Sequence, residues 1–136
     1  LKDDLLRDEG LRLSAYQDSL GYWTIGVGRL IDARKGGGIT RDEAMVLLDH
    51  DIDRIAADVL ARWPWVADLD AVRQRVVLNM AFNLGVIGLA KFRLTLAYIE
   101  GGHYGEAADA MLASRWASQV GARAQRLAAM MWTGAD

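Results

Sequence analysis

The chain contains no cysteine and only two histidines, His50 and His103, among its 136 residues. Without cysteine it forms no disulfide, no thiolate metal site and no thiol nucleophile. The two histidines fall in different predicted helices, and neither has a partner at the spacing of a metal-ligand pair. We therefore expect no metal site and no cofactor, so the chemistry must come from the other side chains.

Long apolar runs and an excess of basic residues are also missing. No stretch approaches the roughly 18 apolar residues of a membrane span, and no basic start followed by an apolar run marks a signal peptide. The formal net charge of −2 argues against general attraction to nucleic acid or to anionic membranes. The composition, 52% apolar and 25% charged, is that of a soluble globular protein. We expect one monomeric domain with no nucleic-acid partner and no stable membrane association.

A short helix is predicted at the start of the chain. Leu1, Leu5 and Leu6 form its apolar face, and Gly10 is expected to end it in a left-handed conformation, which places Glu9 in the last helical turn. The carbonyl end of a helix carries partial negative charge. A carboxylate at that end favours its protonated form if it is also screened from water, and this is the form that a general acid needs.

A β-hairpin is predicted directly after this helix. From residue 11 to 27 apolar and polar residues alternate on either side of the turn at 19–21, which is the pattern of two paired strands. Asp18 ends the first strand and Thr24 lies in the second, so we expect the two to be near-diagonal neighbours on one face. Cleavage of a glycosidic bond needs two carboxyl groups in different environments, one to protonate the leaving oxygen and one to activate water or attack. A hydroxyl beside the second carboxylate can orient the water. The residues alone leave a plainer interpretation open, with Glu9 a surface carboxylate, Asp18 a turn former and Thr24 a strand filler.

The same segment resembles the active-site segment of a known enzyme family. The motifs are Glu9-Gly10-Leu-Arg-Leu, Tyr16-x-Asp18 and Gly21-Tyr22-x-Thr24-Ile25-Gly26-x-Gly28. In order and spacing they are similar to the phage-type, T4-like lysozymes of glycoside hydrolase family 24, and the similarity extends over nearly the whole chain. The resemblance implies Glu9 as the general acid, Asp18 as the base or electrostatic partner and Thr24 as the holder of the attacking water. It also implies inversion at the sugar carbon, with carboxyl groups roughly 6.5–9.5 Å apart.

The resemblance implies a lysozyme-like α+β fold that is mostly α, with a small β-hairpin lobe at about 10–38 and a linking helix at 40–63. Residues 64–136, with the N-terminal helix, form the helical lobe of a single domain, 1–136. The residues themselves support this order of elements. Thr40 and Glu43 form a capping box before an apolar stripe that runs to Trp63. Asp70 can cap a central core helix that reaches Gly85. A break is predicted from Gly85 through Gly88, a further helix then runs to Gly101-Gly102, and more helices follow.

Three further residues match substrate-contacting positions of the family: Leu30, Phe82 and Thr95. The plain alternatives are a half-buried strand residue for Leu30 and a core side chain for Phe82. By the same resemblance Arg123 lies near the catalytic glutamate and supports it. The chain also departs from the family pattern. Arg29 stands where histidine is common, the connection over 30–40 is short, and Ala110 replaces a polar residue of the cleft.

The first functional hypothesis is an endolysin-type muramidase that hydrolyses the β-1,4 bond between N-acetylmuramic acid and N-acetylglucosamine of bacterial peptidoglycan. The resemblance implies that it accumulates in the host cytoplasm before lysis and acts on the cell wall. An alternative is a catalytically weak or dead relative that still binds peptidoglycan, which the three departures favour: Arg29, the short connection over 30–40 and Ala110. A helical nucleic-acid binder is suggested weakly by Arg115, Arg123 and Arg126 and is disfavoured by the acidic balance.

Overall fold

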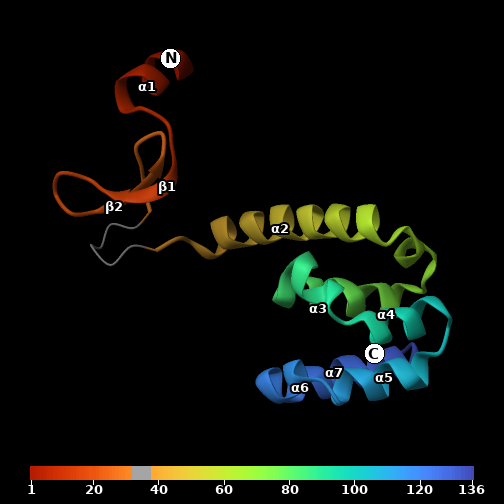
Figure 1. Cartoon of the computed structure of the whole chain (residues 1–136). Helices are drawn as coiled ribbons and strands as arrows, with labels where there is room; N and C mark the ends of the chain where they lie inside the picture. Colours follow the sequence, from red (N-terminus) through yellow and green to blue (C-terminus); the bar gives the residue numbers. More distant parts are fainter. Residues whose placement is uncertain (32–37) are drawn as a thin grey trace. The chain divides into compact units, whose positions relative to one another are not determined.

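The computed structural model of the chain describes residues 1–31 and 38–136 (Figure 1). These residues divide into an N-terminal unit, Leu1–Asp49, and a C-terminal unit, His50–Asp136. Of the short connection over 30–40, residues 32–37 lie outside the described residues. The mostly helical α+β fold expected from the sequence is confirmed, whereas the assignment of the first helix to the helical lobe stays a prediction.

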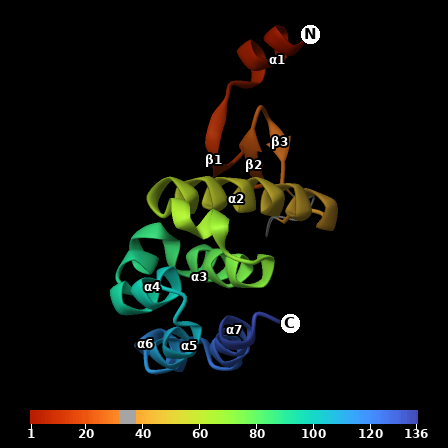
Figure 2. The same cartoon turned by 90° about the vertical axis from the view of Figure 1, so that its right-hand side faces the viewer.

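The N-terminal unit contains helix α1, Lys2–Glu9, and a small antiparallel sheet. The strands are β1, Arg12–Gln17, β2, Trp23–Gly26, and β3, Arg29–Leu30, and they lie side by side in that order (Figure 2). Residues of β1 pair with those of β2 through Tyr16 opposite Thr24, with an irregularity towards Arg12. The predicted hairpin is therefore confirmed. The short third strand that the sequence allowed is present as well.

The end of α1 differs from the expected left-handed stop. Gly10 has a φ of 76°, but its ψ of 156° lies outside the left-handed helical region. The N–H of Gly10 still bonds the carbonyl of Leu6, so the last turn closes before the chain extends. An extended ψ leads the chain straight into β1, which begins two residues later, and only glycine adopts this combination of angles at low cost.

Helix α2, Arg41–Arg62, begins and ends where the sequence predicts. The N–H of Thr40 bonds Glu43 Oε2 at 2.9 Å, and the N–H of Glu43 bonds Thr40 Oγ1 at 3.2 Å, which is the predicted capping box. Pro64 opens the 3₁₀ helix η1, Pro64–Asp68, directly after α2. Of the predicted apolar stripe Val59 is fully buried, whereas Ile52 is exposed.

Helix α3, Ala71–Ala90, is the central element of the C-terminal unit. The Asp70 carboxylate caps its first turn, as predicted, and the helix buries Val76, Val77 and Met80. At Gly85 the backbone leaves the helical conformation, with φ 73° and ψ 163°. The predicted break is therefore confined to one residue, since 86–90 is helical again, and helix α4, Arg93–Glu100, follows.

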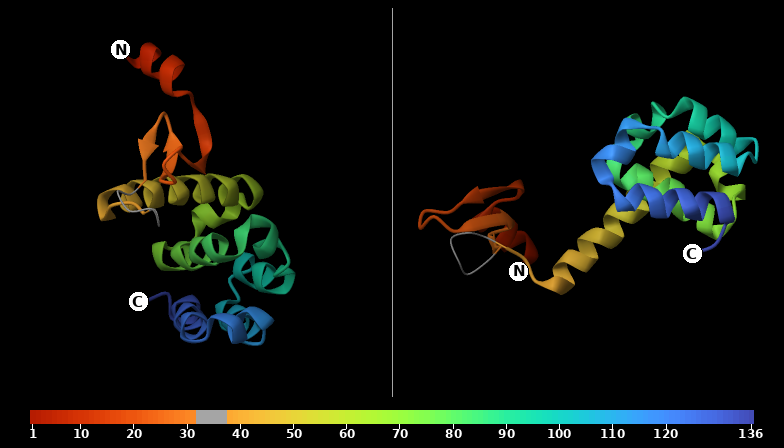
Figure 3. Two further views of the ribbon diagram at one scale, coloured as in Figure 1. Left: turned by 90° about the vertical axis from the view of Figure 1, so that its left-hand side faces the viewer. Right: turned by 90° about the horizontal axis from the view of Figure 1, so that it is seen from below.

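Three helices complete the C-terminal unit: α5, Tyr104–Leu112, α6, Arg115–Val120, and α7, Ala122–Thr133. Helix α7 packs along α5 and also contacts α3 and α6 (Figure 3). Met111, Leu127 and Met131 are fully buried between them. Leu112, the last residue of α5, is 46% exposed, although the neighbouring Met111 is buried.

Within the described part of the chain, no single helix is long and apolar enough to cross a membrane. Helices α3 and α4 meet the length and composition criteria only when taken together, across a bend of 108°.

Candidate active site

Glu9 lies against the turn between β2 and β3. A Cβ built on Gly28 would come within 2.6 Å of Glu9 Oε2 and 3.0 Å of its Cδ, so the carboxyl group sits directly over the glycine. Because α1 ends at Glu9 and Gly28 precedes β3, this contact joins the helix to the far turn of the sheet. Glu9 is exposed in the structure, so the screening from water that a general acid requires is not supplied by its surroundings in the N-terminal unit.

Thr24 occupies the middle of the sheet. It pairs with Tyr16 of β1 on one side and with Leu30 of β3 on the other, and directly opposed residues in a sheet share one face. Thr24 is 5% exposed, and its hydroxyl donates to the Tyr22 carbonyl at 3.2 Å. The oxygen of a hydroxyl keeps its lone pairs when the proton is donated. Thr24 Oγ1 can therefore accept a hydrogen bond from a water.

Asp18 lies at the end of β1, beside the hairpin turn. Its Oδ1 accepts hydrogen bonds from the N–H groups of Leu20 and Tyr22, both at 2.9 Å, and its own N–H bonds the Tyr22 carbonyl. Among the described residues nothing is bonded to Oδ2. Asp18 is thus a turn former, as the plain interpretation holds, and it also keeps one oxygen available as a hydrogen-bond acceptor.

Together these residues form a constellation within one structural unit. The Tyr22 carbonyl accepts from both the Asp18 N–H and the Thr24 hydroxyl, so these two residues are fixed to the same backbone oxygen. Glu9 reaches the same small sheet through Gly28, and Leu30 faces the Thr24 side. Two carboxyl groups and a hydroxyl are therefore grouped around a three-stranded sheet, and these are the kinds of group that acid–base hydrolysis uses.

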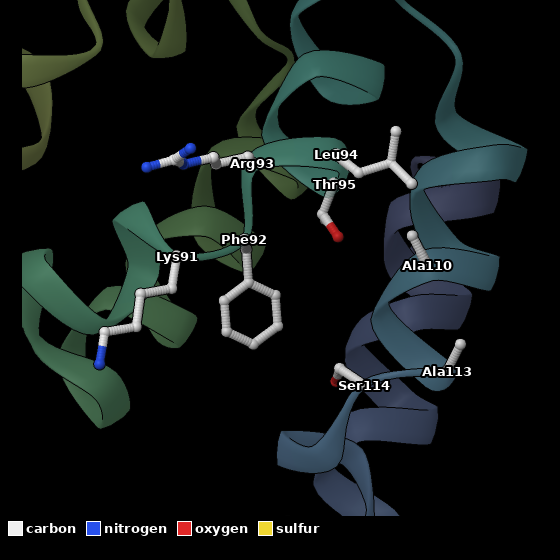
Figure 4. Close-up of a pocket in the computed structure, with 8 residues that line it drawn as sticks. All are labelled: Lys91, Phe92, Arg93, Leu94, Thr95, Ala110, Ala113 and Ser114. Carbon is white, nitrogen blue, oxygen red and sulfur yellow. The ribbon is translucent and has the colours of Figure 1, made fainter.

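A hollow of about 330 Å³ lies in the C-terminal unit between α4 and α5 (Figure 4). Thr95 is 4% exposed, and the structure gives its hydroxyl no hydrogen-bond partner among the described residues. The hydroxyl oxygen points into the space between Phe92 and Ala110. The structure thus brings Thr95 and Ala110 into one cavity, where the Thr95 hydroxyl is accessible to a ligand although the residue as a whole is buried.

Two asparagines of α3, four residues apart, hold the helices that follow. Asn79 Oδ1 accepts from Arg123 Nε at 2.9 Å and from the same guanidinium at 2.7 Å, and Asn83 Oδ1 accepts from Trp116 Nε1 at 2.8 Å. Trp116 is buried and packs edge-on against Phe92. The sequence contains a signal for this arrangement. Two amide side chains four residues apart in an apolar helix lie on the same face, and buried amides need hydrogen-bond partners. That Arg123 supports Glu9 stays a prediction.

The remaining predicted positions are more exposed. Phe82 and Leu30 are each 45% exposed, so Phe82 is not the core side chain that the plain interpretation favoured. Arg29 forms an ion pair with Glu43, the residue that caps α2. Gly28 was missed as a site residue, although the spacing Gly26-x-Gly28 after a strand was a usable signal for a close backbone approach.

Comparison with known proteins identifies the family. The chain matches the phage lysozyme family over residues 7–130, which includes Glu9, the hairpin and α3 to α6 in full. The chain belongs to the phage lysozyme family. It is therefore a glycoside hydrolase of the lysozyme class, and peptidoglycan is its substrate.

Individual relatives in the family include proteins from a slime mould and from phages. The chain is 30% identical to the probable T4-type lysozyme 1 of Dictyostelium discoideum, over 98% of this chain and 94% of that protein. It is 30% identical to the endolysin of Acyrthosiphon pisum secondary endosymbiont phage 1, over 77% of this chain and 70% of that protein. It is also 33% identical to the pre-baseplate central spike protein Gp5 of Enterobacteria phage T4, although the match spans only 27% of that protein.

Proposed function

We propose that the chain is an inverting muramidase that cleaves the β-1,4 bond between N-acetylmuramic acid and N-acetylglucosamine. Glu9 is the general acid, Asp18 the base or electrostatic partner, and Thr24 holds the attacking water. The observation that carries this assignment is the grouping of all three around one small sheet, with Glu9 packed on Gly28 and both other residues bonded to the Tyr22 carbonyl.

In this mechanism the Glu9 carboxyl gives its proton to the glycosidic oxygen as the bond to the sugar carbon breaks. A water that donates to Thr24 Oγ1 and to Asp18 Oδ2 attacks that carbon from the opposite face, and its proton passes to Asp18. The Oδ1 atom takes no part, because it is occupied by the Leu20 and Tyr22 N–H groups, which fix the orientation of the carboxylate. Inversion requires room for the water, so we expect carboxyl groups about 6.5–9.5 Å apart in the substrate complex.

Substrate contacts are proposed for Leu30, Phe82 and Thr95. Leu30 lies opposite Thr24 and is half exposed, so it can contact the sugar whose linkage is attacked. The cavity at Thr95 combines apolar side chains with the accessible Thr95 hydroxyl, a composition that suits an acetamido or methyl-bearing group of peptidoglycan. Ala110 in the same cavity adds no hydrogen bond, so we expect this contact to be modest.

Clearing of a cell-wall suspension, with product analysis, tests the proposal. Glu9→Gln is isosteric but cannot donate the proton, and we expect at least about a 100-fold loss of rate. Asp18→Asn keeps an acceptor for the turn N–H groups and so should remain folded, yet it should also lose activity. The new reducing muramic acid end should have the α configuration. Equal rates for wild type and Glu9→Gln would exclude the proposed acid, and an anhydro product would indicate a lytic transglycosylase instead.

The second candidate is a weak or dead relative that binds peptidoglycan without efficient turnover. Two observations favour it: Arg29 is engaged in an ion pair with Glu43, and Ala110 contributes no polar group to its cavity. Binding of insoluble peptidoglycan by both wild type and Glu9→Gln, with no clearing by either, would establish this candidate and reject the muramidase. Accumulation in a host cytoplasm before lysis, and a monomeric state, remain part of the proposal.

A further inference from the structure

Two glycines lie at the β2–β3 turn of the N-terminal unit, and both have positive φ. Gly26 has a φ of 70° and Gly28 a φ of 62°. Any L-residue at either position therefore carries a similar backbone penalty. Judged by φ, the two glycines are similar.

Their surroundings differ sharply. A Cβ at Gly26 would meet nothing within 4 Å, whereas a Cβ at Gly28 would lie 2.6 Å from Glu9 Oε2, 3.0 Å from Cδ and 3.3 Å from Cβ. All three contacts are to one side chain, and contacts below about 3 Å between such atoms are not tolerated. The group that must move is therefore the Glu9 carboxyl.

We propose that Gly28 is a positioning residue for Glu9, because its missing side chain provides the space in which the carboxyl group is held. The inference rests on the proposed role of Glu9 as general acid. Gly28 need not touch the substrate. It limits how far the carboxyl can approach the sheet that carries Asp18 and Thr24, and it thereby sets the distance between the proton donor and the water-orienting pair.

A methyl group at residue 28 should displace the acid without unfolding the unit. The Glu9 carboxyl group is at the end of a flexible, exposed side chain, so it can rotate away from a methyl at residue 28 at little cost in stability. Displacement of a reacting group by about 1 Å lowers the rate by up to about 100-fold. The loss should appear in kcat, since the sugar contacts proposed for the other residues are unchanged.

The experiment compares the purified full chain as wild type, Gly28→Ala, Gly26→Ala and Glu9→Gln on soluble peptidoglycan fragments. The assay temperature lies well below the lower of the two glycine variants' unfolding midpoints, so that both are folded. We expect similar midpoints for the two, a kcat about 10- to 100-fold lower in Gly28→Ala than in Gly26→Ala, and similar KM values. Equal kcat values in these two variants would overturn the inference.

A second comparison uses a shorter acid. Glu9→Asp withdraws the carboxyl by one methylene group, so the methyl of Gly28→Ala loses its two shortest contacts, to the carboxyl atoms, and keeps only the one to Cβ at 3.3 Å. We expect the Gly28→Ala change to lower kcat by less than about 3-fold in the Glu9→Asp background, a non-additivity that a purely structural role would not produce. The same loss in both backgrounds would reject the positioning role.

The controls separate this inference from the proposed function. If Glu9→Gln is as active as wild type, the general-acid assignment itself fails, and the inference fails with it. If Glu9→Gln is inactive while Gly28→Ala and Gly26→Ala are equally active, the muramidase proposal stands and only the positioning role of Gly28 is rejected.

Discussion

At the scale of single residues, the polar groups of the N-terminal unit each combine a structural and a chemical capacity. Asp18 Oδ1 accepts the hydrogen bonds that close the hairpin turn, and its Oδ2 stays available as an acceptor. The Thr24 hydroxyl donates its proton to the Tyr22 carbonyl, and its oxygen keeps lone pairs that can accept another hydrogen bond. A side chain fixed by one hydrogen bond is oriented for another without further loss of rotamer freedom. The turn-forming and the catalytic interpretations of Asp18 are therefore compatible.

Thr95→Val tests the cavity in the C-terminal unit. Removing the hydrogen bond of a buried threonine normally lowers the free energy of unfolding by about 1 kcal/mol. The Thr95 hydroxyl has no partner among the described residues, so the valine variant should be at least as stable as wild type. If the hydroxyl binds substrate, KM should rise by roughly 5- to 10-fold with little change in kcat. Thermal unfolding and steady-state kinetics on the same preparation check both parts, and an unchanged KM would remove Thr95 from the substrate contacts.

At the scale of secondary structure, Arg73 connects the start of α3 to the end of α7. Its guanidinium donates to Asp70 Oδ2 at 2.9 Å, to the Met131 carbonyl at 2.7 Å and to the Trp132 carbonyl at 2.8 Å. The same group lies 3.7 Å from the ring centre of Tyr104. The last carbonyls of a helix have no partner within the helix. The Arg73 guanidinium donates hydrogen bonds to them, and its positive charge interacts favourably with the negative end of the helix dipole.

The cap of α3 should make stability depend on pH. Partial burial acts to raise the pKa of the Asp70 carboxyl, but hydrogen bonds from the Arg73 N–H and guanidinium, with the Arg73 charge, hold that pKa below its ordinary value. Because the folded pKa is depressed, the contribution is present above about pH 4 and is lost as pH falls through the folded pKa. The midpoint difference between wild type and Asp70→Asn should therefore shrink from pH 6 to pH 2.

Thermal unfolding at several pH values measures this difference. Asp70→Ala removes the cap as well as the charge and should cost about 1 kcal/mol even where Asp70→Asn is neutral. Asp109→Asn is the matched control, because Asp109 is exposed and the structure shows no partner for its side chain among the described residues. A difference that grows as the pH is lowered would contradict the assigned role of the carboxylate.

At the scale of the whole molecule, the fully buried apolar side chains are concentrated in the C-terminal unit. Among the described residues, each of them lies at or after Val59 in the sequence. The described part of the N-terminal unit has no cluster of fully buried apolar side chains. Its interactions include hydrogen bonds, among them that of the buried Thr24, and the ion pair between Arg29 and Glu43. Burial of apolar surface dominates the stabilisation of folded chains, so the two units should differ in local stability.

Hydrogen exchange tests this difference in stability. Amides of α3, α5 and α7 should exchange only through global unfolding, because these helices surround Met111, Leu127 and Met131. Amides of β1 and β2 should exchange at least about 10-fold faster, through opening of the small sheet alone. Mass spectrometry of peptides from the two units measures both rates under the same conditions. Equal protection in the two units would show that they unfold as one cooperative body.

The sequence by itself determined the features that depend on neighbours a few residues apart. The Thr40–Glu43 capping box, the Asp70 cap and the hairpin around the 19–21 turn follow from local hydrogen bonding and from the period of the apolar residues. The catalytic candidates Glu9, Asp18 and Thr24 came from motif resemblance, and their roles stay a prediction, although all three lie in the N-terminal unit.

Only the tertiary structure decided which distant residues meet. Gly28 lies under Glu9, Asn79 holds Arg123, and Thr95 faces Ala110 across a cavity, although these partners are separated by 15 to 44 residues along the chain. Such contacts depend on how whole helices and strands pack. The spacing of apolar residues predicts which face of a helix is buried, but it does not predict which residues of other elements that face contacts. Packing also left Phe82 half exposed, which its place in an apolar helix did not indicate.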